Sequence, residues 1–246
     1  MIYPRGTAKQ LMRKRAGGPY STVTILVAIL AILAFIRWGG LTTAKTPSKS
    51  TPPLSGVSDV VLRLGDLPSG WRASSSSTNS LHVADTTTAH CTGATLPGAS
   101  QEIGHVASPD FTDATSAVAV ASDAVAYLSV ADRTEVLDLY GSPNYPECLA
   151  ASYRNQGSGS STIGSVAVSI GPPPPTVSVP DATVVTVSFT VSSSGGVTTP
   201  YTAVIIALGA GTIACAVEIE GEGTTVSSTL VSQVAGTMNT RLLEAS

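Results

Sequence analysis

Few residues in this chain have the types and spacing that could do chemistry. The 246 residues include three histidines and three cysteines. His90 and Cys91 are adjacent and could supply half of a metal site, but no second pair of ligands follows at the spacing that such a site needs. The histidines also do not form the H-E-x-x-H pair of zinc proteases. We therefore expect no metal-ligating residue and no cofactor.

Three glutamates alternate near the end of an apolar run. Glu218, Glu220 and Glu222 would point to one side of a strand, because side chains alternate between the two faces. Such a row could present carboxylates to a cation or a sugar. The favoured interpretation is an exposed strand face that makes the domain soluble.

The stretch from Gly209 to Ala214 has the spacing G-x-G-x-x-A of a dinucleotide-binding fingerprint. That fingerprint must lead into a helix, and here it leads into "ACAVEIE", which alternates like a strand. We expect a hairpin turn instead. No G-x-S-x-G motif for a serine hydrolase is present either. We therefore predict no catalytic residue, and a protein that is not an enzyme.

The cysteines suggest a disulfide. Cys215 lies in the middle of a predicted strand, where a buried thiol packs as a small apolar group. Cys91 lies in a segment with loop composition, and Cys148 lies on a short predicted helix. We predict a Cys91–Cys148 disulfide, which would be stable only outside the cytoplasm.

The N-terminal region resembles a membrane anchor. Residues 1–20 are basic, and a membrane helix is predicted at 21–38. From Val23 to Ile36 only Thr24 is polar, and Tyr20 and Trp38 flank this run. Basic residues before the segment predict a single-pass helix with its N-terminus in the cytoplasm and its C-terminus outside. Residues 39–54 are small, polar and rich in proline, as in a flexible linker. The alternative is a signal peptide cleaved after about Ala44.

Charge excludes one class of partner. From residue 55 onward the chain has five arginines, no lysine and all sixteen acids, a net charge of −11. Such a domain repels phosphate backbones, so we expect no nucleic-acid partner.

The folded domain is predicted to span 55–246 and to start with a short helix. Val57, Val60, Val61 and Leu64 have helical spacing, with Ser55 as the N-cap and Gly65 as a left-handed end. Pro68 then prevents the helix from resuming, and "PSG" turns the chain. We expect Trp71 to leave this turn as a large buried anchor, with Pro68 fixing the corner.

The remaining pattern predicts an α+β domain. We expect strands at "EIGHVASP" and "TSAVAVAS", a helix capped by Ser122 or Asp123 that ends at Gly141, and a second helix at "NYPECLAASYRNQG". Four alternating strands follow, interrupted by Pro172–Pro175, and Val226–Leu243 reads as an amphipathic helix. Short turns between successive strands imply an antiparallel sheet, with the helices covering one face.

Two motifs give a resemblance. The "DLPSGW" corner and the cysteine in "YPECL" resemble a group of actinobacterial exported domains of unknown function. This group is similar to the extracellular sensor domain of mycobacterial receptor kinases and to PsbP/Mog1-like lipoproteins. The resemblance implies an extracytoplasmic place and a fold, and it carries over no catalytic residue.

We therefore predict a membrane-anchored, extracytoplasmic binding or sensor-like module without catalytic activity, whose partners are the membrane and an envelope ligand or protein. The alternatives are a cell-envelope enzyme that uses paired carboxylates, and a structural or assembly partner of another membrane protein.

Overall fold

The computed structural model describes residues 56–74, 86–113, 115–155, 161–222 and 226–246. The predicted basic tail, membrane segment and linker, at 1–20, 21–38 and 39–54, lie outside the described residues. In the part of the chain that is described, no helix is both long enough and apolar enough to cross a membrane.

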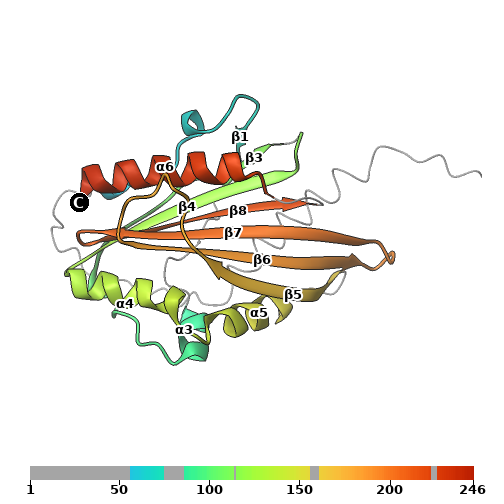
Figure 1. The fold of residues 1–246 in the computed structure, drawn as a ribbon, viewed down its shortest axis with the longest axis horizontal. Coiled ribbons are helices and arrows are strands. Elements are labelled where there is room, and N and C mark those ends of the chain that lie inside the picture. Colours follow the sequence, from blue (N-terminus) through green and yellow to red (C-terminus); the bar gives the residue numbers. More distant parts are fainter. Residues whose placement is uncertain (1–55, 75–85, 114, 156–160, 223–225) are drawn as a thin grey trace, which may run out of the picture.

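The described strands form one eight-stranded antiparallel sheet, in the order β1-β3-β4-β8-β7-β6-β5, with β2 also paired to β4 (Figure 1). The strand bounds are β1 Arg72–Ala73, β2 Glu102–Ala107, β3 Phe111–Asp113, β4 Val118–Tyr127, β5 Ser161–Gly171, β6 Asp181–Ser193, β7 Thr198–Ala210 and β8 Ile213–Glu222. The prediction of a mixed domain with an antiparallel sheet is confirmed.

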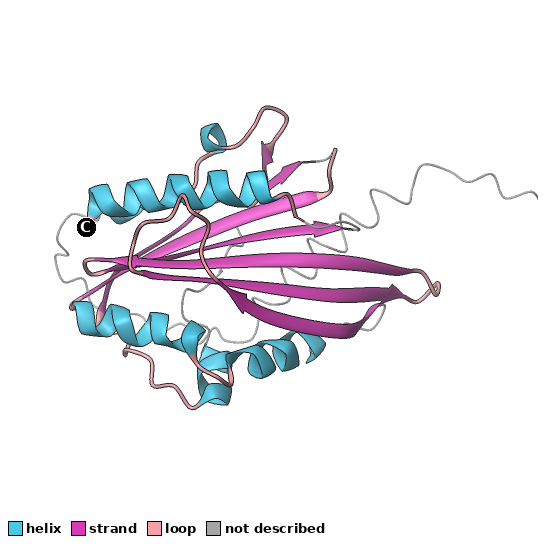
Figure 2. Ribbon diagram, viewed as in Figure 1, coloured by secondary structure: helices cyan, strands magenta, loops and turns pink. Residues whose placement is uncertain are grey.

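Helices cover both faces of this sheet, so the prediction that they cover one face is wrong (Figures 1 and 2). The helices α2 and α6 lie on one side, and α3, α4 and α5 lie on the other. The helix bounds are α2 Val57–Val60, η1 Leu64–Asp66 (a 3-10 turn), α3 Thr86–Thr92, α4 Val130–Gly141, α5 Tyr145–Asn155 and α6 Ser228–Ala245.

A separate apolar core fills the space on each side. The core on the α6 side contains Val60, Phe111, Ile206, Ile219, Met238 and Leu242. The core on the α5 side contains Tyr127, Val136, Val185, Val187, Ala203 and Ala216. Because β8 and β7 are central, their residues alternate between the two cores. Both faces of the sheet are therefore buried at its centre, and alternate residues of β7 and β8 pack into different cores.

The first helix is shorter than predicted. It ends at Val60, and Val61 has an extended backbone with φ −68° and ψ 154°. Leu64 is 44% exposed and begins the 3-10 turn instead of continuing a buried stripe. The left-handed glycine of this region is Gly70, with φ 104°, and not Gly65 as predicted. The apolar residues with helical spacing do start a helix, but the helix ends at Val60, one turn before the predicted end at Gly65.

The corner between η1 and β1 is fastened to the last helix. Asp66 accepts hydrogen bonds from the backbone N–H of Arg63, at 2.6 Å, and from the Arg241 guanidinium, at 2.6 Å. Arg241 also donates to the carbonyl of Val61 at 2.8 Å. Trp71 follows the corner with 9% of its surface exposed, in the core on the α6 side. This placement agrees with the anchoring role that we predict for it.

The helix predicted to start at Ser122 or Asp123 begins later. Strand β4 runs through both residues, and α4 is capped by Ser129, whose hydroxyl accepts a hydrogen bond from the N–H of Asp132 at 3.1 Å. Ser122 and Asp123 are both fully buried. Ser122 uses its hydroxyl within the fold instead, where it accepts the N–H of Leu62 at 2.9 Å. Two typical cap residues thus serve as buried polar groups of a strand.

The glycines of the apparent dinucleotide fingerprint have structural roles. Gly211 has φ 52° in the turn between β7 and β8, a conformation that favours glycine. At Gly209 an added Cβ would collide with Leu137 and Arg133 of α4, so glycine allows that helix to pack closely on β7. The prediction of a hairpin in place of a nucleotide site is confirmed.

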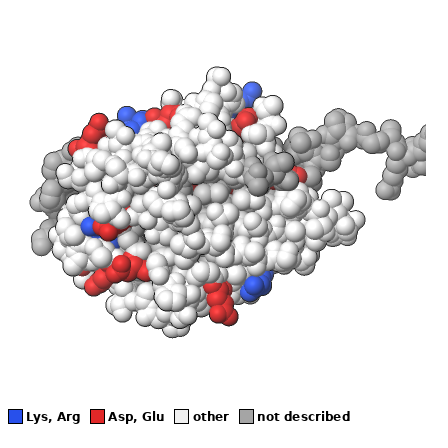
Figure 3. Space-filling model, viewed as in Figure 1, with Lys and Arg blue, Asp and Glu red and all other residues white. Residues whose placement is uncertain are grey.

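Charged side chains are unevenly spread over the surface. The face of the molecule that is visible in Figure 3 carries few charged residues, and its acids and basic residues lie mainly toward the rim. An acidic domain with a net charge of −11 after residue 55 therefore also presents a large uncharged area.

Truncating the anchor tests the corner. We expect Trp71→Ala to lower the free energy of unfolding by about 3–5 kcal/mol, because it empties a large buried site. The measurement is chemical denaturation of the full chain. Leu64→Ala is the control in the same corner, and its exposed side chain predicts a much smaller loss. Equal losses for the two variants would contradict the assignment of Trp71 as the anchor.

Candidate functional site

The three alternating glutamates lie on a covered face of the sheet. Glu218, Glu220 and Glu222 continue the side of β8 that carries Ala214 and Ala216, which belong to the core on the α5 side. Glu220 is only 7% exposed. The predicted exposed strand face is therefore wrong at Glu220. We call these three glutamates the β8 acid row.

Helix α5 holds the first of these acids. The Tyr153 hydroxyl donates a hydrogen bond to Oε1 of Glu218 at 3.0 Å. The Tyr153 ring lies against Phe189 with 5.1 Å between ring centroids, and Phe189 stacks on Tyr201 at 5.4 Å. A row of aromatic rings on α5, β6 and β7 therefore lies beside the acid row and lowers the local polarity.

Burial changes the acid–base properties of this row. Burial, and next the charge of Glu218, raise the pKa of Glu220 to about 8. At neutral pH Glu220 is therefore mostly a neutral carboxylic acid, which can donate a hydrogen bond. Burial and the same two glutamates also raise the pKa of Tyr153. Neighbouring acids with different environments are a common basis for binding and for acid–base chemistry.

A second polar group lies on the same face, one strand away. On β4, Asp123 pairs with Ala216 of β8, so its side chain points to the α5 side as well. Its Oδ2 lies 3.1 Å from Nε2 of His105 on β2, with side-chain exposures of 0% and 33%. The hydrogen bond to Asp123 raises the pKa of His105, and burial opposes this effect. The Tyr127 hydroxyl on this face has no hydrogen-bond partner among the described residues.

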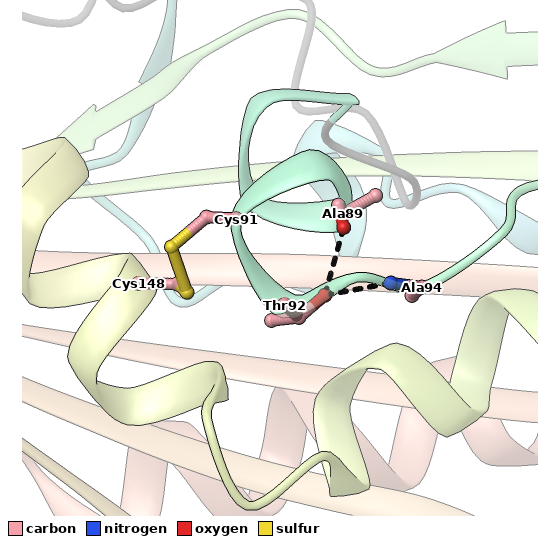
Figure 4. Close-up of a disulfide and its surroundings, with 5 residues drawn as sticks. All are labelled: Ala89, Cys91, Thr92, Ala94 and Cys148. Atoms are coloured by element: carbon pink, nitrogen blue, oxygen red, sulfur yellow. Dashed lines mark hydrogen bonds between the residues drawn. A yellow bond between two sulfur atoms is a disulfide. The ribbon is translucent and has the colours of Figure 1, made fainter.

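The predicted disulfide is present and lies on this side of the sheet. Cys91 of α3 and Cys148 of α5 are bonded, with 5.7 Å between their Cα atoms (Figure 4). The bond joins α3 to the helix that carries Tyr153. A loop of this length predicts a stabilisation of about 4 kcal/mol on the chain-entropy model.

Cys91 lies on a helix, although its segment was expected to be a loop. Threonine-rich sequence is a poor helix former, but Thr88 and Ala89 are buried and the disulfide fixes the next turn. The hydroxyl of Thr92 donates to the carbonyl of Ala89 at 3.0 Å and accepts the N–H of Ala94 at 3.3 Å, which ends the helix (Figure 4). Packing and a covalent bond thus overrule the local preference.

The remaining predicted residues lie elsewhere. Trp71 belongs to the core on the other side of the sheet, and Pro68 is exposed at the corner. Cys215 is buried and unbonded, as expected of a thiol in a strand. The structure therefore brings the disulfide to the same side as the acid row and leaves the tryptophan corner on the opposite side. The sequence reveals the acid row by alternation, and the one hint of its burial is that it continues the face of Ala214 and Ala216.

Two further observations concern ligands. Among the described residues, no three histidine, cysteine, aspartate or glutamate side chains lie together as a metal site requires. A surface pocket of about 450 Å³ opens between α2 and the end of α6. Its lining consists of Gly56, Asp59, Arg63, Arg241, Glu244 and Ala245. Arg63 and Asp59 pair with each other there, so the pocket carries charges of both signs.

Comparisons with known proteins find similarity in structure but none in sequence. No family model matches the chain, and no curated protein matches its sequence. Among solved structures, the chain is similar to the extracellular domain of PknH from Mycobacterium tuberculosis. The TM-score is 0.41 at 11% sequence identity, and the match covers 79% of this chain and 98% of that one.

The raised pKa of Glu220 predicts a pH dependence of stability. Between about pH 4.5 and 8 the unfolded chain has lost this proton and the folded chain has kept it. Stability should therefore fall as pH rises across this window, by up to about 1.4 kcal/mol per pH unit from this group. Glu220→Gln, which cannot ionise, should flatten that part of the slope in denaturation experiments.

The control for this prediction is Glu135→Gln, which changes an exposed acid of α4. It should leave the slope unchanged. His105, whose pKa is also raised, contributes in the same direction near neutral pH and remains in both variants. Identical pH profiles for Glu220→Gln and the unmodified chain would contradict the assignment of a protonated Glu220.

Proposed function

We propose that this protein is an extracytoplasmic binding or sensor-like module without catalytic activity, held at the cell membrane by its N-terminal segment. The observation that carries the proposal is the Cys91–Cys148 disulfide. Structural disulfides persist in oxidising compartments and are rare in the bacterial cytoplasm. The disulfide therefore supports a domain that folds and works outside the cytoplasm.

The proposed anchor is the apolar segment at 21–38. Five basic residues precede it within the first fifteen positions, which favours retention of residues 1–20 in the cytoplasm. The linker at 39–54 would then let the domain stand clear of the membrane surface, with a reach of about 20 Å. Neither the anchor nor the linker belongs to the described residues.

The proposed ligand site is the end of the β8 acid row. Glu222 is partly exposed where β8 ends, and Glu220 lies next along the same face. The protonated carboxyl of Glu220 offers a donor and the neighbouring carboxyl oxygens offer acceptors, which suits a hydroxyl-rich envelope ligand or a cation. The Phe189 and Tyr201 rings beside the row would add apolar contact.

A second candidate function is a cell-envelope hydrolase. Glycosidases use one protonated and one ionised carboxyl group, about 5–10 Å apart. Glu218 and Glu220 are two positions apart on one strand, which places their Cα atoms about 7 Å from each other. The raised pKa of Glu220 would suit the acid of such a pair. Both acids point the same way from one strand, however, and do not face each other across a cleft.

Thiol chemistry tests the compartment. In intact cells that express the full chain, we expect Cys91 and Cys148 to react with a membrane-impermeant thiol reagent only after reduction. Cys215 should stay unreactive until the domain unfolds, because it is fully buried and burial raises its pKa. Cys215→Ser is the matched control and should give the same labelling in the folded protein. Free, reactive Cys91 and Cys148 in untreated cells would contradict the proposed location.

A binding screen tests the module itself. Thermal unfolding of the full chain should shift upward with at least one class among envelope glycans, lipids and divalent cations. The shift should shrink in Glu222→Gln and persist in Glu135→Gln. No shift with any class would count against a small-ligand site. Hydrolysis of a glycan that is lost in both Glu218→Gln and Glu220→Gln would favour the enzyme over the binding module.

A further inference from the structure

Strand β5 forms one edge of the sheet and carries no charge. It is last in the strand order and pairs only with β6 among the described strands. Its eleven residues include no Asp, Glu, Lys, Arg or Pro. Ala167 and Ser169 are exposed, and Ile170 keeps 42% of its surface exposed. From Val166 to Gly171 its pairing with β6 is regular, so the outer edge of this part is a straight row of backbone donors and acceptors.

The strands at the other edge of the sheet have features that discourage pairing with another chain. There β1 has two residues and includes Arg72, and β3 has three residues and ends at Asp113. Strand β2 begins with the exposed Glu102 and has a register shift directly after it. Short strands, charges and irregular register all discourage edge-to-edge pairing. Strand β5 shares one of these devices, a shift between Ile163 and Val166, and the stretch after it has none.

We propose that β5 is an interaction surface at which two copies of this chain pair edge to edge, so that their sheets join as one antiparallel sheet. Two-fold symmetry makes antiparallel pairing of identical strands self-complementary. Centred on Val168, the pairing places Ile170 beside Val166 of the second copy and Ala167 beside Ser169 of the second copy. It therefore covers the exposed Ile170 with an apolar neighbour.

Charge favours a second copy as the occupant. The domain carries a net charge of −11 after residue 55, so two copies repel each other over most of their surfaces. The β5 edge and the neighbouring open positions of β6, Thr186 and Ser188, are uncharged. The two edge strands can therefore meet without placing an acid on either strand, while the exposed Glu147 and Arg154 lie on α5, which packs beside β5.

The contact is expected to be reversible. Centred on Val168, the pairing can run only from Ser165 to Gly171. These seven residues are about 23 Å long and make a small interface compared with stable dimers. Self-association should therefore rise with concentration, and stable dimers should be absent at high dilution.

Paired substitutions test the edge. In the full chain in detergent, sedimentation velocity should show a concentration-dependent dimer. Ala167→Lys/Ser169→Lys should abolish it, because the register puts each new lysine opposite another and like charges directly opposite are destabilising. The matched control is Thr186→Lys/Ser188→Lys, at the positions of β6 that pair with Ser169 and Ala167, on the same face but one strand inward. We expect the control to keep the dimer.

A second measurement does not depend on the lysine variants folding. A photo-crosslinking amino acid at Ser169 should give a covalent dimer whose link maps to β5 of the second copy, and the same group at Ser188 should give little. A monomer at every concentration, loss of the dimer in both lysine variants, or crosslinks that map away from β5 would each overturn the proposal.

Discussion

The fold depends on the double burial of its central strand. Strand β8 has paired neighbours on both edges and helices over both faces, so every side chain from Ile213 to Val217 is buried. On the α6 side, β8 contributes the fully buried side chains of Cys215, Val217 and Ile219. On the other side small residues, Ala214 and Ala216, leave room for α4 and α5. The same constraint draws Glu220 into the interior, where an ionised carboxylate would be costly.

The acids on the α5 side of the sheet are each stabilised in a way that suits a position away from water. Glu220 keeps its proton, Glu218 receives a hydroxyl from Tyr153, and Asp123 is paired with His105. Each arrangement lowers the cost of an acid in the interior in a different way: by neutralisation, by a hydroxyl donor, or by a hydrogen bond with an imidazole. The disulfide matters here because Cys148 lies on the helix that supplies Tyr153, so the covalent bond also holds a polar partner in place.

Much of this architecture could be predicted from the sequence, and the failures have physical reasons. The β6–β7 and β7–β8 hairpins and helix α6 follow from strong periodicity, and the disulfide from the contexts of three cysteines. The helix at α3 was missed because its stability comes from packing and from a cross-link. The sequence predicts a strand up to Ser122 but not its continuation to Tyr127, because cap-type residues also serve as buried hydrogen-bonding groups when the tertiary fold supplies partners.

The burial of the acid row could not be read from alternation alone, because alternation places Glu218, Glu220 and Glu222 on one face without saying what covers that face. One covering element is α5, which packs on β5 and is bonded to α3, more than fifty residues earlier in the chain. The packing of segments far apart in the sequence therefore contributes to whether a carboxylate lies on the surface or in the interior. In this domain the Cys91–Cys148 bond, which suggests a place outside the cytoplasm, also joins α3 to the helix whose Tyr153 binds Glu218.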